Sequence, residues 1–182
     1  MVHKNILRFM LNISSSSQLV LTYFILAIAI VFNNTFALFL FFAQIFKIFI
    51  LFYPKKIFKG SSLGNRPKGA YDCNLFNCGG KPNRGGIISG HMTSITMLFT
   101  SLLLSMNVAG IFNKKLLMLG SFIIVTTGIS KFLTKCHTLF QIVLGCFTGI
   151  ILGFASFKIQ SLITNNRFNK DKNKVLNIFK LI

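Results

Sequence analysis

Long apolar runs alternate with short polar connections along this chain. Residues 14–46 contain no charged side chain, and further runs of low charge cover 85–113, 116–130 and 136–157. A helix needs roughly 20 mainly apolar residues to cross a bilayer, so the first run alone is long enough. The pattern predicts an all-α protein, a polytopic bundle of transmembrane helices with about five spans, at 18–32, 35–53, 91–112, 116–129 and 139–163.

The polar segments divide the chain around these runs. Residues 1–17 form a basic, Ser-rich lead-in, residues 18–163 a membrane-embedded domain, and residues 164–182 a basic tail. Asn33 and Asn34 are the only break between the first two spans, so a tight hairpin is expected there. Lys47 interrupts the second run, and we expect its ammonium group to snorkel to the membrane interface. Within the domain, 54–90 is a long polar loop rich in cations and glycines, and long loops in compact domains are usually functional.

Composition agrees with a bilayer environment and excludes several kinds of chemistry. Hydrophobic residues make up 53% of the 182 positions, and 20 Lys and Arg residues stand against two carboxylates, Asp72 and Asp171. The cations lie in the connections rather than in one arm or on one helical face, which favours contact with anionic headgroups of a lipid bilayer over a nucleic-acid partner. With so few carboxylates, paired-carboxylate hydrolysis and a carboxylate cage for a divalent metal are excluded, and we expect no cofactor.

Three short segments carry the residues suited to chemistry. If five spans are correct, all three segments meet at the same membrane face, because each lies where one apolar run ends or the next begins. The segments contain Lys59 with Arg66-Pro67, then Ser89-Gly90-His91, then Ser130-Lys131 with His137.

The first property of this set is that it can hold an anion. A helix that begins near Ser89-Gly90-His91 presents free backbone N–H groups, and Gly90 lets an oxygen approach the backbone closely. Arg66 can bind two phosphate oxygens as a fork, while Lys59 and Lys131 act as point charges. The alternative is that these cations are solvated loop residues, and that the histidine is an interfacial cap.

The second property is that two histidines, His91 and His137, fall at helix starts on that face. A pair of imidazoles can supply a nucleophile and a proton donor without a metal. The sequence therefore favours a site that holds a phosphate group at a membrane surface and moves it through a histidine.

These segments resemble the motifs of the type 2 phosphatidic acid phosphatase superfamily, a family of membrane lipid phosphatases. The resemblance spans residues 59–150, and the first motif, Lys-x6-Arg-Pro, is met in full by Lys59, Arg66 and Pro67. The second motif, Pro-Ser-Gly-His, is met by Ser89-Gly90-His91, with Ile88 in place of proline. The segment between them is similar to lipid phosphatases encoded by large DNA viruses.

The third motif, Ser-Arg-x5-His-x3-Asp, departs at two positions. Ser130 and His137 match it, whereas Lys131 replaces arginine and Gln141 replaces aspartate. The lysine keeps the charge and loses the bidentate fork. Gln141 lies four residues after His137 on one helical face. Its carbonyl can accept the His137 Nδ1–H if its amide end is held elsewhere, and the dolichyl-diphosphate phosphatase branch has a similar glutamine.

The resemblance implies a metal-free phosphatase of lipid phosphates or lipid diphosphates that works through a phosphohistidine. It implies that His137 attacks phosphorus, that His91 protonates the leaving oxygen and then activates water, and that Gln141 orients His137. It also implies a site on the extracytoplasmic or lumenal face. The residues implied to bind phosphate are Lys59, Arg66, Ser89, Gly90 and Lys131. A phosphotransferase on the same scaffold and a non-catalytic binder of anionic headgroups remain alternatives.

The cysteines add one further expectation. Cys73 and Cys78 lie in the polar loop and can pair if that face is extracytoplasmic. No second cysteine pair has the spacing of a zinc site. Cys136 and Cys146 border or enter a span and are expected to be packing residues.

Overall fold

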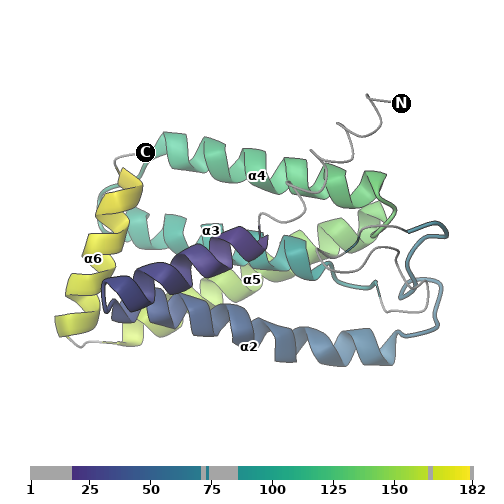
Figure 1. Cartoon of the computed structure of the whole chain (residues 1–182), viewed down its shortest axis with the longest axis horizontal. Helices are drawn as coiled ribbons and strands as arrows, with labels where there is room; N and C mark the ends of the chain where they lie inside the picture. The colour runs from purple at the N-terminus through teal and green to yellow at the C-terminus, as the bar shows by residue number, and fades with distance from the viewer. Residues whose placement is uncertain (1–17, 71–72, 74–85, 164–165, 181–182) are drawn as a thin grey trace.

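The computed structural model describes residues 18–70, 73, 86–163 and 166–180, and all regular structure in this part of the chain is helical. The prediction of an all-α protein is therefore confirmed for these residues. The helices are an N-terminal helix Gln18–Val31, α2 Thr35–Ile57, α3 Gly90–Val108, α4 Lys114–Leu133, α5 Leu139–Leu162 and α6 Asn166–Lys180 (Figure 1). The lead-in 1–17 lies outside the described residues.

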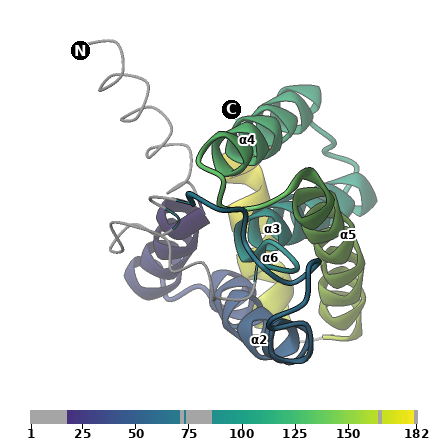
Figure 2. The same ribbon diagram turned by 90° about the vertical axis from the view of Figure 1, so that its right-hand side faces the viewer.

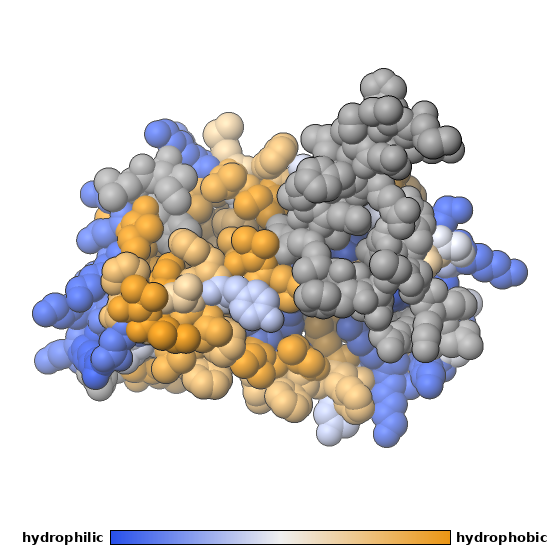
Figure 3. Space-filling view, in the orientation of Figure 1, coloured by the Kyte–Doolittle hydropathy of each residue, from blue (hydrophilic) through white to orange (hydrophobic). Residues whose placement is uncertain are grey.

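Helix α3 is the centre of the bundle, with the N-terminal helix, α2, α4 and α5 around it and α6 lying across one end (Figures 1 and 2). Three helices, α2, α4 and α5, are long and apolar enough to cross a membrane, and the N-terminal helix is shorter. The visible surface is apolar around the middle of the long axis and hydrophilic towards both ends (Figure 3). A helical membrane protein fits these features. The described residues contain three candidate spans, so the prediction of five is not confirmed.

Helix α5 approaches α3 through a stripe of glycines, Gly145, Gly149 and Gly153. A Cβ added to Gly149 would lie 2.7 Å from the Thr96 Cβ and 2.8 Å from the Thr93 carbonyl oxygen. Helices in membranes associate through such small residues, because lipid supplies little hydrophobic force between them. This close packing sets the beginning of α3 against the beginning of α5, where His91 and His137 lie.

The basic tail is largely an amphipathic helix, α6, which the sequence analysis did not predict. Val175 and Leu176 are buried against the bundle. The Phe168 ring meets the Phe36 ring edge-on, with centroids 5.6 Å apart. The remaining face of α6 is rich in Lys and Asn, as in helices that lie at an interface.

Asp171 of α6 caps the beginning of α2. Its Oδ2 accepts hydrogen bonds from the Thr35 backbone N–H and hydroxyl, both at 2.8 Å. The Asn34 amide donates to the Asp171 carbonyl oxygen at 3.1 Å. The Thr35 N–H is the main cause that holds the pKa of the Asp171 carboxyl below its ordinary value. This carboxylate therefore serves the fold, at the end of α2 remote from the histidines.

Lys47 does not snorkel, and the prediction that it does is wrong. Its side chain is buried, and its ammonium group donates to the Ser94 hydroxyl of α3. The Gln44 amide donates to the Ser94 carbonyl oxygen at 3.2 Å. The bundle interior offers oxygens close to Lys47, and a buried ammonium requires such partners.

Candidate functional site

The chemistry-bearing segments meet at one end of the bundle. Helices α2 and α4 end there, while α3 and α5 begin there (Figure 1). The sequence analysis expected these segments to share a face, and the structure places them together.

The turn from α4 to α5 holds His137 from both sides. Lys135, two residues after the end of α4, has a left-handed backbone conformation. The Cys136 N–H donates a hydrogen bond to the Lys131 carbonyl oxygen at 3.0 Å. This pattern is a Schellman motif, which satisfies the last carbonyl groups of a helix. Immediately after His137, Thr138 caps α5 with its side chain. The His137 backbone is therefore confined between two helix caps.

A disulfide between Cys73 and Cys136 attaches the polar loop to this turn. The two Cα atoms are 5.3 Å apart, and the Lys131 ammonium donates to the Cys73 carbonyl oxygen at 3.0 Å. Cys73 therefore does not pair with Cys78, which the sequence had left open, and the prediction that Cys136 is a packing residue is wrong. Cys78 itself lies outside the described residues, and Cys146 is a free, half-buried thiol.

The His137 ring is oriented by a backbone carbonyl. Nδ1 lies 2.9 Å from the Gly86 carbonyl oxygen and 3.3 Å from the Gln141 Oε1. Both oxygens are acceptors, so Nδ1 carries the proton, and in the neutral ring Nε2 keeps its lone pair. Gly86 can come this close because it lacks a side chain. A Cβ there would lie 2.9 Å from the Gln141 Oε1 and 3.0 Å from the Arg66 Cγ.

His137 is neutral at physiological pH. Burial lowers the pKa of its imidazole to about 3, and the charge of Arg66 is the next largest cause. Lys131 and Lys55 lower the pKa further, while the bond to Gly86 partly opposes them. A neutral ring with its proton on Nδ1 presents a nucleophilic Nε2.

Gln141 joins the loop before Arg66 to the beginning of α5. Its Nε2 donates to the Leu63 and Asn65 carbonyl oxygens at 2.8 and 3.0 Å. Its Oε1 accepts from the Thr138 N–H at 3.2 Å, which completes a capping box. The amide end is thus held elsewhere, as the sequence analysis required for Gln141 to assist His137. Its shorter bonds, however, go to the loop.

The structure brings Lys55 to the cluster, one helical turn before the predicted Lys59. A Cβ added to Gly90 would lie 3.5 Å from the Lys55 Nζ and 3.8 Å from the Leu51 Cδ1. Lys59 lies two residues beyond the end of α2 and is exposed. The sequence analysis ended this span near Tyr53, whereas α2 continues through Ile57 and keeps Lys55 on its inner face. The four-residue spacing of Lys47, Leu51 and Lys55 could have revealed that face.

The beginning of α3 completes the cluster. The Ser89 N–H donates to the Gln141 carbonyl oxygen at 3.2 Å. The Ser89 Oγ is buried and has no hydrogen-bond partner among the described residues. Gly90 is the first residue of α3, and His91 follows it, partly buried. The charges of Lys131, Lys47 and Lys55 act on the His91 ring, which places it among the cations.

This arrangement can bind an anion and attack it. It combines a neutral imidazole, a second histidine, several cations, a helix beginning and a buried hydroxyl. The residues that the structure describes contain no group of three or more His, Cys, Asp or Glu side chains placed to hold a metal ion. Sequence reasoning missed the Gly86 carbonyl, and no residue pattern could have indicated it, since every residue has a carbonyl group.

Comparison with family models, with curated proteins and with solved structures finds no match to this chain. The geometry of the site and the motifs of the sequence are therefore the basis for a functional assignment.

Proposed function

We propose that this chain is an integral membrane phosphatase that hydrolyses a lipid phosphate or lipid diphosphate through a phosphohistidine. The observation that carries the proposal is the state of His137. Its Nδ1 is turned to the Gly86 carbonyl oxygen at 2.9 Å, and its pKa is about 3. The Nε2 lone pair is therefore available beside the cations at neutral pH.

In the first step, the His137 Nε2 forms a bond to phosphorus while the bond from phosphorus to the lipid oxygen breaks. His91 passes to that departing oxygen a proton that it takes from the bound phosphate monoanion. In the second step, water loses a proton to His91 and displaces the phosphate from His137. His91 then returns the proton to the free phosphate, which restores both rings. Lys55, Arg66 and the N–H groups at the beginning of α3 stabilise charge on the phosphate oxygens, and such donors contribute about 10²–10³ each in rate.

Lys131 and Lys59 have different places in this proposal. The Lys131 ammonium is buried and donates to the Cys73 carbonyl oxygen, so it positions the loop in addition to contributing charge. The exposed Lys59 is better suited to attracting anionic lipid to the site than to contacting phosphate. Lys55 takes the contact that the motif resemblance implied for Lys59.

The test is release of inorganic phosphate from phosphatidate, lysophosphatidate and a polyprenyl diphosphate by the purified chain. His137→Ala should abolish release and also any phosphoprotein trapped by denaturation in alkali. The matched variant His137→Asn keeps an N–H group for the Gly86 carbonyl, so its loss of activity reports the nucleophile rather than the fold. Chelation with EDTA should leave the rate unchanged, and vanadate should inhibit as an analogue of the pentacoordinate transition state.

The other outcomes assign the site differently. Transfer of the phosphoryl group to an alcohol, without free phosphate, would make the chain a phosphotransferase. Binding of anionic lipid without turnover would make it a headgroup binder. Loss of hydrolysis on chelation would contradict the metal-free mechanism.

The disulfide supports a site on the extracytoplasmic or lumenal face, because disulfides persist in oxidising compartments. The exposed Lys68 lies in the loop at that end of the bundle. In a cell-surface membrane, a cysteine introduced as Lys68→Cys should react with a membrane-impermeant thiol reagent in intact cells, and reaction only after permeabilisation would place the site on the cytoplasmic face. In sealed microsomes, whose outer surface is cytoplasmic, the expected reaction requires permeabilisation, and reaction without it would place the site on the cytoplasmic face.

A further inference from the structure

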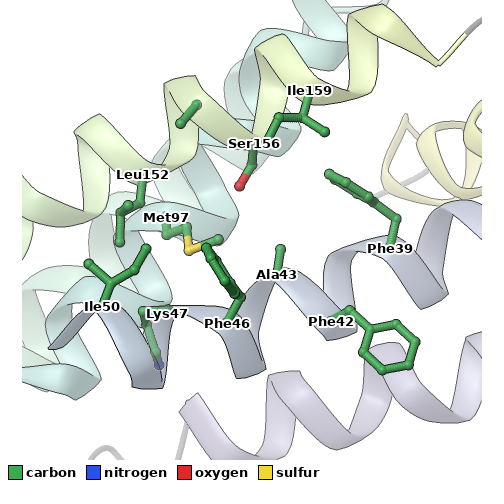
Figure 4. Close-up of a pocket in the computed structure, with 11 residues that line it drawn as sticks. Phe39, Phe42, Ala43, Phe46, Lys47, Ile50, Met97, Leu152, Ser156 and Ile159 are labelled. Atoms are coloured by element: carbon green, nitrogen blue, oxygen red, sulfur yellow. The ribbon is translucent and has the colours of Figure 1, made fainter. Parts of the chain in front are cut away.

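An apolar groove of about 270 Å³ lies between α2 and α5. Helix α2 packs on α3 and α6, and its direct contact with α5 is slight, so the space between α2 and α5 stays open. Figure 4 shows Phe39 and Phe46 of α2 on one side, with Leu152, Ser156 and Ile159 of α5 on the other. Phe46 and Ile159 are exposed on the outside of the bundle, where lipid would surround them.

The groove leads towards the site along α2. Its lining runs from Phe39 to Ile50, roughly 16 Å of helix, and Ile50 lies little more than one turn before Lys55. The inner face of α2 continues through Leu51 to Lys55, and both side chains lie against Gly90 at the beginning of α3. The α2 residues that line the groove are therefore followed, along the same helix, by the two side chains that reach Gly90.

The geometry of displacement favours the same path for the leaving group. In an in-line displacement at phosphorus, the nucleophile and the departing oxygen lie on opposite sides. Lys131 and Lys55 act on both histidine rings, whereas Arg66 acts on His137 alone and Lys47, which lines the groove, acts on His91 alone. His91 is the proton donor to the departing oxygen, so the lipid part of the substrate lies on the side of the groove.

From these observations we propose that the groove between α2 and α5 binds the single hydrocarbon chain next to the scissile phosphate, so that the substrate enters laterally from the bilayer. The assignment rests on the proposed phosphatase function and says where the apolar part of its substrate lies. The apolar lining, the slight contact between α2 and α5, and the position of Leu51 and Lys55 beside Gly90 favour this occupant.

A second apolar groove, of about 310 Å³, is the structural rival. It is lined by α3, α4 and α5, and includes Val125, Phe132 and Leu139. Leu139 follows His137 by two residues and Met92 follows His91 by one, so this groove also borders the histidines. Unlike the groove between α2 and α5, it has no cation in its lining that acts on His91.

The test is the dependence of kcat/KM on chain length for ethyl, butyl, hexyl and octyl phosphate, each below its micelle-forming concentration. Burial of a methylene favours binding by a factor of about four, so the wild type should gain at least about twofold for each carbon added. Ala43→Phe places a ring in the middle of the groove from a half-buried position. It should remove most of this gain and leave ethyl phosphate within about twofold of wild type.

The matched control is Val125→Phe, which adds a ring to the rival groove and should keep the chain-length dependence. An unchanged dependence in Ala43→Phe, or an equal loss on ethyl and octyl phosphate, would overturn the assignment. So would loss of the dependence in Val125→Phe alone. If the wild type releases phosphate from phosphatidate but hydrolyses none of the four alkyl phosphates, this assignment alone is overturned. If it releases phosphate from no lipid phosphate either, the proposed function fails, and this assignment fails with it.

Discussion

The role of Gln141 gives the most discriminating prediction, because an isosteric change reverses its hydrogen bonding. In Gln141→Glu, a carboxylate oxygen replaces the Nε2 that donates to the Leu63 and Asn65 carbonyl oxygens. Two favourable contacts become contacts between acceptors. Both bonds are only partly buried, so we take about 1 kcal/mol for each, at the lower end of the range for unsatisfied acceptors.

A loss of about 2 kcal/mol, if transmitted to the transition state through a displaced Arg66, corresponds to a roughly 30-fold decrease in kcat/KM at pH 7. The new carboxyl is buried among carbonyl oxygens, so its pKa should be raised. Below that pKa it is protonated and can donate one hydrogen bond again. The kcat/KM of Gln141→Glu should therefore recover in part as the pH falls. An enzyme that depends on an ionised catalytic carboxylate would instead lose activity as the pH falls.

The matched control is Gln160→Glu on the same helix. Gln160 is also buried, but its partners are the Ser101 and Ser105 hydroxyls, which can rotate to donate to a carboxylate. It lies roughly 28 Å along α5 from Gln141. The assay is hydrolysis of a lipid phosphate from pH 5 to 9, with circular dichroism to establish folding. Activity of Gln141→Glu within twofold of wild type, or a decrease equal to that of Gln160→Glu, would refute the reasoning.

The shorter change Gln141→Asp, which restores the family residue, should also lower activity. Its side chain is one methylene shorter and carries no donor for the two loop carbonyl groups. An increase in turnover would indicate that the site has decayed from one built around aspartate.

Further predictions concern the loop and His137. In Gly86→Ala, the methyl group would lie 3.0 Å from the Arg66 Cγ and closer still to the Gln141 amide, so displacement of the carbonyl should lower kcat at least about tenfold in a steady-state assay. Cys73→Ser removes a disulfide that spans 63 residues, and should lower the free energy of unfolding by about 2–4 kcal/mol in a thermal unfolding experiment. A wild type whose stability is the same with and without reductant would contradict this prediction. The His137 pKa is about 3 when folded and 6.5 as the ordinary value, so below pH 6.5 the unfolded chain gains a proton that the folded chain does not. The free energy of unfolding should therefore decrease as the pH falls from 6.5 to about 3, with a contribution from His137 of up to roughly 1.4 kcal/mol per unit, and the slope should be smaller by this contribution in His137→Asn.

The sequence by itself determined the helical elements and the end of the bundle at which the site lies. Apolar side chains favour lipid or the bundle interior, and polar side chains favour the connections, so the pattern of the two predicts where helices begin and end. The expected bounds of α4 and α5 therefore differ from the observed ones by a few residues at most. The glycine stripe of α5 and the spacing of Phe168, Val175 and Leu176 in α6 were also legible in the sequence. They are local periodicities, although the sequence analysis did not use them.

Tertiary structure decided which residues are partners. Four features depend on contacts between segments far apart in the chain. They are the Cys73–Cys136 disulfide, the Gly86 carbonyl that orients His137, the position of Lys55 beside Gly90 and the burial of Lys47. The sequence analysis expected 91–112 to be one of five spans, but its pattern did not indicate that α3 is the central helix, which buries most of its Ser and Thr residues against its neighbours. Local pattern specifies what environment a residue prefers, but the packing of helices specifies which neighbour provides that environment.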